Sequence, residues 1–356
     1  MGLGFGSLLP WQKTTVLNSL LPTLPEEEKL GVALVGMGNY ATNQLAPALE
    51  VSKMCKLAGI VTGTPFKAAD WLQRKPALKD HIYDYATFDQ IANDDSIDIV
   101  YVVLPNSMHA EYTIRAAKAG KHVICEKPMS LNEAEGKTMV EACERANRRF
   151  SIGYRLHFEP HNMEATRLGQ EQVYGKVLHM DTAFGFKIGD PTQWRLRHNL
   201  AGGGAMMDVG IYAIQAARYV TGEEPIQVTA QEFKTDPVKF AEVDETMTWQ
   251  MTFPSGCVVN STTSYALSTH RLFASAERGW FELRPAYSYG GIKGVTSDGP
   301  MEFPQINQQA AQMDDFAHCI KNDLPSSADG HEGLRDMRVI DAIYRSIKTG
   351  KPVSIG

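Results

Sequence analysis

The sequence predicts an α/β protein in which a parallel sheet covered on both faces is followed by an α+β domain with a large, mostly antiparallel open sheet. Three observations predict this architecture. An apolar run ends in a glycine-rich turn at residues 36–41, strands and helices alternate up to about residue 154, and longer strands with few helices follow. Alternation of this kind is typical of parallel sheets, and serial strands are typical of antiparallel ones.

The first region reads as near-continuous apolar strands separated by amphipathic helices, which indicates strands buried on both faces. Residues 66–74 begin a helix after the turn Thr62–Pro65, and Pro105 ends the third strand. The predicted strands are residues 31–35, 56–61, 97–104, 122–125 and 150–154, and the predicted helices are residues 40–52, 66–74, 109–119 and 132–147.

The second region has strands in series and two closing helices, one of which carries apolar residues at helical spacing from Leu334 to Ile347. The predicted strands are residues 177–184, 226–234, 246–253, 258–264, 271–275 and 280–283, and the predicted helices are residues 313–322 and 334–349. We therefore expect an N-terminal arm over 1–29, a nucleotide-binding domain over 30–154, and a substrate-binding and oligomerisation domain over 155–356. The last helix is expected to pack back on the first domain.

Composition excludes several classes of function. The 356 residues carry a net charge of -6 with dispersed Lys and Arg, so nothing indicates a nucleic-acid groove. No apolar run approaches the roughly 20 residues that span a bilayer. The five cysteines lack CxxC spacing, the histidines lack metal-ligand spacing, and HExxH and GxSxG are absent. The expected partner is a small molecule, with no metal, nucleic acid or membrane.

The glycine-rich turn has the form of a dinucleotide-binding motif. Gly36-Met37-Gly38-Asn39-Tyr40-Ala41 matches G-x-G-x-x-G/A between a strand and a helix. The first glycine permits the tight turn, the second allows the backbone close to a pyrophosphate, and the helix N-terminus offers free N–H groups to the anion. This context predicts a Rossmann domain, although the same pattern alone is an ordinary glycine turn.

The end of the second strand distinguishes NADP from NAD. NAD sites place a carboxylate there for the ribose hydroxyl, whereas this chain has Thr62-Gly63 with Lys67 a helical turn later. A hydroxyl and an ammonium suit a 2'-phosphate, so we predict NADP(H). The alternative interpretation of Lys67 is a solvated helix residue.

A lysine and an aspartate–tyrosine pair are the catalytic candidates. Lys127, in Glu126-Lys127-Pro128, follows a strand whose C-terminal end faces the cofactor crevice, and it can stabilise an alkoxide and move a proton. Asp208 and Tyr212 are four apart on a predicted helix, so both can orient a polyol and relay its proton. The alternatives are a surface lysine, a dipole-favoured acid and a half-buried tyrosine.

Other polar residues could line a sugar pocket. Arg155 and His157 follow the last strand of the first region, and Trp194 and Arg195 precede the triple glycine 202–204. Packing with solvated charge is the alternative for these residues.

At these positions the chain resembles the glucose-fructose oxidoreductase and inositol dehydrogenase family, and within it the glucose-fructose oxidoreductases. The resemblance runs from about Gly31 to Val353 and rests on the motifs above together with residues 82–85, 104–107, 153–155 and 194–197. It implies that Lys127, Asp208 and Tyr212 are catalytic. It implies these cofactor contacts: Gly36, Met37, Gly38, Asn39, Tyr40, Thr62, Gly63, Lys67, Tyr85, Leu104, Asn106, His109, Glu126, Lys127, Arg155, Trp194 and Arg195. The substrate candidates are Lys127, Arg155, His157, Asp208, Tyr212 and Tyr287.

The resemblance implies tightly bound NADP(H) that oxidises an aldose to its lactone and then reduces a second sugar, in a periplasmic homo-oligomer, either a dimer or a tetramer. The chain shows no export signal, and the cytoplasm is the alternative compartment. Residues 1–29 hold only three prolines and no arginine, unlike the proline-rich arm of that relative. The alternative functions are an NADP-dependent aldose 1-dehydrogenase that releases NADPH and a non-enzymatic dinucleotide sensor.

Overall fold

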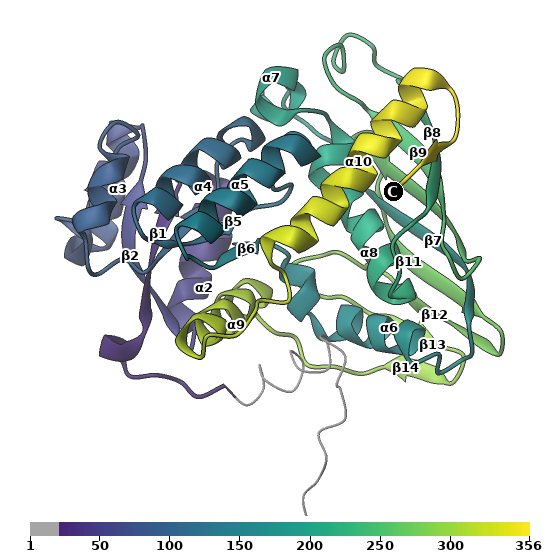
Figure 1. Cartoon of the computed structure of the whole chain (residues 1–356), viewed down its shortest axis with the longest axis horizontal. Coiled ribbons are helices and arrows are strands. Elements are labelled where there is room, and N and C mark those ends of the chain that lie inside the picture. The colour runs from purple at the N-terminus through teal and green to yellow at the C-terminus, as the bar shows by residue number, and fades with distance from the viewer. Residues whose placement is uncertain (1–20) are drawn as a thin grey trace, which may run out of the picture.

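The computed structural model describes residues 21–356, so most of the predicted arm, residues 1–20, lies outside the described residues. Two sheets lie side by side, with helices packed over and between them (Figure 1). Leu21 is buried against the first sheet, and the Leu24 amide donates to the Lys53 carbonyl at 2.9 Å. This part of the predicted arm is therefore attached to the first domain.

The first sheet is parallel throughout and has six strands in the order β3-β2-β1-β4-β5-β6. The order reverses between β1 and β4, which is the switch point where ligands bind in such sheets. The predicted Rossmann fold is confirmed. The strands are β1 Leu30–Val35, β2 Cys55–Val61, β3 Ile82–Tyr83, β4 Ile99–Val102, β5 His122–Cys125 and β6 Phe150–Ile152.

Helices cover both faces of this sheet. Side chains of α4 and α5 join the hydrophobic core on one face, and those of α2, α3 and the much later α9 join the core on the other. The helices are η2 Ala41–Leu45, which has π register, α2 Ala46–Val51, α3 Pro65–Arg74, α4 His109–Lys118, α5 Glu133–Arg145 and α9 Gln308–Lys321. A helix from the end of the chain thus completes the nucleotide-binding half.

The second sheet has nine strands in the order β14-β13-β12-β11-β7-β10-β9-β8-β15, and every pair is antiparallel except β7 with β10. Burial alternates along strands such as β8, so one face is covered and the other is open. This confirms the predicted mostly antiparallel sheet. Its strands are β7 Val177–Gly185, β8 Gln227–Phe233, β9 Thr246–Thr252, β10 Val258–Ser264, β11 Thr269–Ala276, β12 Gly279–Leu283, β13 Gly294–Thr296, β14 Gly299–Met301 and β15 Val353–Ser354.

The remaining helices are α6 Pro160–Gln170, α7 His198–Ala201, η8 Met206–Gly210, α8 Ile211–Thr221 and α10 Gly330–Thr349. Helix α10 contacts both β8 and α5, and Glu133 at the start of α5 pairs with Arg338 at 3.1 Å. It therefore touches both sheets' layers, as Figure 1 shows. The domain boundary at residue 154 stays a prediction.

Helix α6 was not predicted. Its polar start, Pro160-His161-Asn162, lacks an apolar stripe, but Pro160 occupies the first turn and the Glu159 side chain accepts from the Asn162 amide at 2.9 Å. Helix α10 begins four residues before the predicted start because Asp329 caps it through the Glu332 amide at 2.9 Å. Local capping thus sets both helix starts.

All five cysteines are buried and free. Among the described residues, no helix is long and apolar enough to cross a membrane. In the same part of the chain, no group of three or more His, Cys, Asp and Glu side chains is placed to hold a metal ion.

Candidate active site

The glycine-rich loop joins β1 to the π-register helix η2. Gly36 has φ +100, and a Cβ there would lie 2.7 Å from the Val103 carbonyl oxygen and 2.7 Å from Leu104, so only glycine fits. A Cβ on Gly38 would meet no atom within 4 Å. The backbone at Gly38 therefore borders open space in which a pyrophosphate could lie against it.

The side chains of the glycine-rich loop differ in how far they are exposed. Met37 is buried in the core, Asn39 is exposed, and Tyr40 packs its ring 5.9 Å from the ring of Tyr289 in the second half of the chain. The N–H groups that open a helix have no partner four residues back, so they can hydrogen-bond an anion. The loop thus offers an anion cradle next to a contact between the two halves.

The end of β2 matches a 2'-phosphate better than a ribose hydroxyl. Thr62 and Gly63 follow the strand, and the Tyr85 ring lies directly on Gly63, where a Cβ would come within 2.7 Å of the ring. Among residues 21–356, the ammonium of Lys67, in the first turn of α3, has no hydrogen-bond or ion-pair partner. A hydroxyl, an aromatic face and a cation thus follow this strand end, and no carboxylate stands there.

Lys127 and Asp208 are brought together from the two halves of the chain. Lys127 follows β5 and Asp208 lies in η8, and the Lys127 Nζ donates to the Asp208 backbone carbonyl at 2.5 Å and to its Oδ1 at 3.1 Å. Both side chains are largely buried. An ammonium has three N–H donors, so one remains for a further acceptor. Two of the three candidate catalytic residues are therefore in direct contact.

Asp208 is the centre of a charge network. Its Oδ2 pairs with Arg195 Nε at 3.1 Å and accepts from the Tyr265 hydroxyl at 3.0 Å. Burial raises the pKa of Asp208, but the neighbouring Arg195 and Lys127 cations outweigh it and lower this pKa to about 2. Asp208 is therefore a carboxylate at neutral pH.

Lys127 stays protonated for the complementary reason. Burial acts to lower its pKa, but the neighbouring Tyr212, Asp208 and Glu126 raise it more, so the pKa of Lys127 lies above its ordinary value. The Nζ also lies 5.0 Å from the centroid of the Tyr212 ring. The geometry therefore supplies a fixed cation beside a phenol.

Arg155 organises the other side of Tyr212. Its guanidinium carbon lies 5.1 Å from the Tyr212 ring and 4.4 Å from the Tyr289 ring. It also donates to the carbonyls of Tyr287 at 2.6 Å and Ser288 at 3.1 Å. Because these protein acceptors hold its terminal nitrogens, Arg155 positions the 287–289 loop rather than presenting a free fork to a ligand.

Three of the predicted cofactor contacts have side chains whose polar atoms bond within the protein. Glu126 is buried and accepts from the Tyr101 hydroxyl at 2.7 Å. Asn106 donates to the Ala201 carbonyl at 2.8 Å, and the two ring nitrogens of His109 lie 2.8 and 2.9 Å from the Pro128 and Leu104 carbonyls. These side chains tie strand ends and α7 together, and their cofactor contacts stay predictions.

Three further predicted residues lie at the margin of the cluster. The guanidinium carbon of Arg195 lies 4.7 Å from the centroid of the Trp194 ring, and this stacking positions Arg195. Tyr287 is buried behind Tyr212, with ring centroids 6.0 Å apart, and its hydroxyl donates to the Arg271 carbonyl. His157 has no contact with Lys127 or Asp208 and instead packs against Tyr219. The structure therefore does not bring His157 and the Tyr287 hydroxyl to the reacting centre.

Sequence reasoning missed Tyr265, Tyr289 and Gln308 as residues of the site. Tyr265 follows β10, Tyr289 is half exposed, and the Gln308 amide oxygen accepts from Arg155. None lies in a motif. The one available signal was the aromatic and glycine content of 287–291, which is unusual for a short connection.

Two family models match the chain. The one described as "Oxidoreductase family, NAD-binding Rossmann fold" covers residues 30–154, and the one described as "GFO/IDH/MocA C-terminal domain" covers residues 163–283. The chain belongs to the GFO/IDH/MocA family of oxidoreductases. The resemblance predicted from the motifs is thereby confirmed, and with it the assignment as an oxidoreductase.

Two halophile relatives within this family have been named as sugar dehydrogenases. D-xylose 1-dehydrogenase (NADP(+)) of Haloarcula marismortui is 31% identical over 335 residues, covering 91% of this chain and 92% of the relative. D-xylose 1-dehydrogenase (NADP(+)) 2 of Haloferax volcanii is 29% identical over 280 residues, covering 76% of this chain and 84% of the relative.

A solved family structure is also similar. The aldose-aldose oxidoreductase of Caulobacter crescentus, complexed with glycerol, is 43% identical with a TM-score of 0.89, and the match covers 92% of this chain and 99% of that one. Because the match covers 92% of this chain, the shared fold extends through most of it.

Proposed function

We propose that this protein is an NADP-dependent oxidoreductase of sugars that oxidises an aldose to its lactone. The observation that carries the proposal is the contact of Lys127 with Asp208 beside Tyr212, at the carboxyl edge of the parallel sheet. The names of the xylose dehydrogenases and of the aldose-aldose oxidoreductase support the same substrate class.

The glycine loop and the end of β2 fit the cofactor. The open space at Gly38 would take the pyrophosphate, and Thr62, Gly63, Lys67 and Tyr85 would hold the 2'-phosphate end of NADP. When bound, NADP⁺ supplies the acceptor for the hydride that leaves the sugar carbon. Retention of this cofactor through successive turnovers is part of the proposal.

Lys127 and Tyr212 divide the proton chemistry. Because its surroundings keep Lys127 protonated, its remaining N–H donates to the reacting sugar oxygen and stabilises the negative charge that develops there. In its phenolate form Tyr212 accepts the hydroxyl proton during oxidation and becomes the phenol, and during reduction the phenol returns that proton to the sugar oxygen. Asp208 holds the Lys127 ammonium in place, and Arg195 balances the charge of Asp208.

The experiment that tests this assignment is Lys127→Ala. General acid–base and charge stabilisation of this kind contribute about 10²- to 10⁴-fold, so turnover with D-xylose or D-glucose should fall by that factor while NADP remains bound. Unchanged turnover would remove Lys127 from the mechanism.

A second candidate is an aldose 1-dehydrogenase that releases NADPH at each turnover, and the name of the Haloarcula relative favours it. Nicotinamide absorbance and mass spectrometry of freshly purified, dialysed protein separate the two. A retained cofactor, which a second sugar such as D-fructose reoxidises within the same protein, supports the two-sugar cycle. A cofactor lost on dialysis supports the simple dehydrogenase.

Assembly and compartment are further proposals. The open face of the second sheet exposes Leu178, Phe233 and Trp280, and we infer a homo-oligomer formed through this face, to be tested by light scattering. We also infer a periplasmic location from the family resemblance, to be tested by fractionation of the native host.

A further inference from the structure

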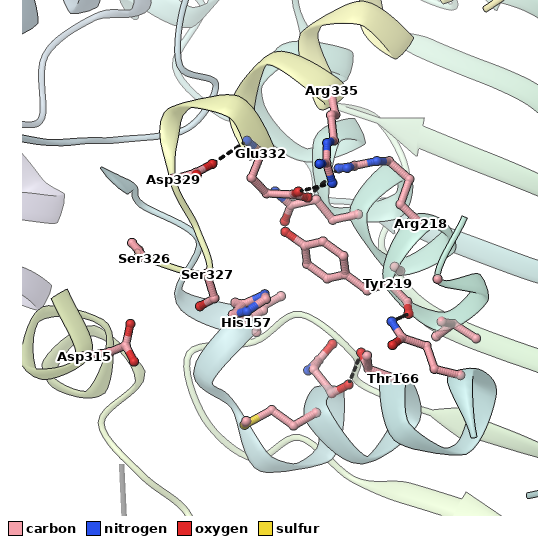
Figure 2. A pocket seen from close by; sticks show the side chains of 18 of the residues that line it. His157, Thr166, Arg218, Tyr219, Asp315, Ser326, Ser327, Asp329, Glu332 and Arg335 are labelled. Atoms are coloured by element: carbon pink, nitrogen blue, oxygen red, sulfur yellow. Dashed lines mark hydrogen bonds and ion pairs between the residues drawn. The ribbon is translucent and has the colours of Figure 1, made fainter. Parts of the chain in front are cut away.

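A second cavity of about 660 Å³ lies apart from the Lys127 and Asp208 pair. Figure 2 shows it between α6, the end of α8, the connection from α9 to α10, and the first turn of α10. Its size and its position between two layers are typical of small-molecule sites. Lys127 and Asp208 do not line it, but Tyr212 does.

One stripe of α8 forms a wall of this cavity. Tyr212, Gln215, Ala216 and Tyr219 have helical spacing on one face, and all four line the space. The stripe starts at the phenol beside Lys127 and ends two turns later at Tyr219. A rigid helix therefore joins the cavity to the candidate catalytic cluster.

Polar groups on the wall lack partners. Within residues 21–356, His157 Nε2 and Ser327 Oγ are buried with no hydrogen bond. Figure 2 shows His157 beside Ser327, and Tyr219 reaching toward the first turn of α10. Buried polar atoms are normally satisfied, and an unsatisfied one destabilises the fold. Two such atoms side by side on one cavity wall indicate a site for hydrogen-bonding guests.

The charges of the wall disfavour an anion. The Arg218 guanidinium is already paired with Glu224 at 2.7 Å, Glu332 at 2.8 Å and Asp336, while Arg335 at the rim is half exposed and pairs with Glu332 at 3.2 Å. Four carboxylates line the cavity against these two arginines: Glu224, Asp315, Asp329 and Glu332. A phosphate or carboxylate ligand would meet net negative charge and no free cation.

Asp315 gives the wall mixed donor and acceptor character. Asp315 is buried, and one of its carboxylate oxygens accepts from the Cys319 thiol at 3.9 Å. Burial raises the pKa of Asp315 to about 7. Near neutral pH the carboxyl is therefore partly protonated and can donate as well as accept. The aromatic faces of Tyr219 and His157, with rings 5.2 Å apart at 79°, supply apolar surface between these groups.

We propose that this cavity is a second binding site for a neutral polyhydroxyl compound, a monosaccharide or an alditol, and that its occupancy is transmitted along α8 to Tyr212. Alternating donors and acceptors on an aromatic surface match a polyol. An apolar ligand would leave the His157 and Ser327 atoms unsatisfied. The proposal goes beyond the proposed function, since this ligand is not the molecule that reacts.

The test uses the full chain with NADP⁺ added, labelled with 3-fluorotyrosine and followed by ¹⁹F NMR. The Tyr219 and Tyr212 resonances are assigned by their loss in Tyr219→Phe and Tyr212→Phe. Titration with sorbitol is expected to move the Tyr219 resonance saturably, and the Tyr212 resonance with the same half-saturation. Sodium phosphate is expected to move neither.

The cavity is then filled by Thr166→Trp on α6, which should abolish the Tyr219 response. Thr138→Trp is the matched control, because Thr138 is exposed on α5, away from the cavity. The hydroxyl of Thr138 donates to a carbonyl of its own helix at 2.7 Å, as the hydroxyl of Thr166 does at 2.9 Å. If Thr166→Trp does not fold, Ser327→Leu should weaken sorbitol binding about five-fold, the loss of one neutral hydrogen bond.

Three outcomes would overturn the proposal: no saturable response of Tyr219, a response to phosphate instead of sorbitol, or a response that persists in the filled variant. A Tyr212 response without one from Tyr219 would place sorbitol at the catalytic cluster alone and would equally overturn it. The readout needs no turnover, so failure here is distinguishable from failure of the proposed sugar oxidation.

Discussion

Replacing Asp208 by Asn should move the loss of activity at high pH to much lower pH. The Lys127 Nζ lies 3.1 Å from the Asp208 carboxylate, and two unit charges at that distance interact by about 5 kcal/mol at an effective dielectric constant of 20. This attraction favours the protonated ammonium, so its loss lowers the pKa of Lys127.

The direction of the pKa change follows from the opposing effects of burial and of neighbouring charges on Lys127. Burial lowers its pKa, while Asp208 is one of the groups that raise it. Without the carboxylate, burial and the nearby Arg195 cation are less opposed, so the pKa of Lys127 falls. Glu126 remains as one anionic neighbour that favours the ammonium. The cation needed for the reaction would then be lost at a lower pH than in the parent.

The assay is kcat/KM for D-xylose oxidation measured against pH, which reports the ionisations of the free enzyme. The control is Asp181→Asn, because Asp181 is a more exposed carboxylate on β7 that pairs with Arg271 at 3.5 Å. A profile of Asp208→Asn that superimposes on the parent, while Lys127→Ala is inactive, would refute the reasoning that Asp208 sets the protonation of Lys127.

Three further predictions follow from the same geometry. Gly38→Val should raise the NADP⁺ Kd at least about ten-fold without lowering Tm, because a side chain there meets only open space. Gly36→Val, the contrasting variant, should destabilise the fold. Parent-like NADP⁺ affinity in Gly38→Val would mean that the pyrophosphate does not pass this residue. Lys67→Ala should weaken the affinity for NADP⁺ roughly ten- to hundred-fold in calorimetry and leave the affinity for NAD⁺ nearly unchanged. Lys79→Ala, at another exposed lysine, is the control. Equal losses of affinity for both nucleotides would exclude a contact of Lys67 with the 2'-phosphate. Arg218→Met should lower the free energy of unfolding in urea by about 3–5 kcal/mol, because fully buried Asp336 loses its cation. The control Arg145→Met removes an exposed ion pair and should lower this free energy by less than about 1 kcal/mol. Similar losses in the two variants would contradict the buried-pair argument.

The sequence was sufficient for the features that local chemistry determines. Gly36 and Gly38 stand where the chain needs a positive φ and an open backbone, and the apolar runs of β1 and β4 are buried on both faces, so the motif and the sheet were both predictable. The lack of an acid after β2 was equally visible. These features depend on a few consecutive residues.

The contacts that complete the site could not be predicted because they join distant segments. Tyr265 reaches Asp208 across 57 residues, and Arg155 reaches the Tyr287 carbonyl across 132. Glu126 is a further example, since its motif predicts a cofactor contact but the bond of its side chain to the Tyr101 hydroxyl appears only in the fold. Direction of a side chain at a strand tip depends on tertiary packing, which no local pattern encodes.

The π-register turn at Met206–Gly210 makes the position of Asp208 sensitive to chain length. Such a turn contains one residue more than an α-helical turn and completes nearly the same rotation, so the extra residue is accommodated locally. Deletion of one residue at this turn during evolution would therefore move the carboxylate of Asp208 while leaving Tyr212 and Tyr219 close to their present directions. Homologues that lack this extra residue are expected to keep the place of both tyrosines and to hold the lysine ammonium in another way.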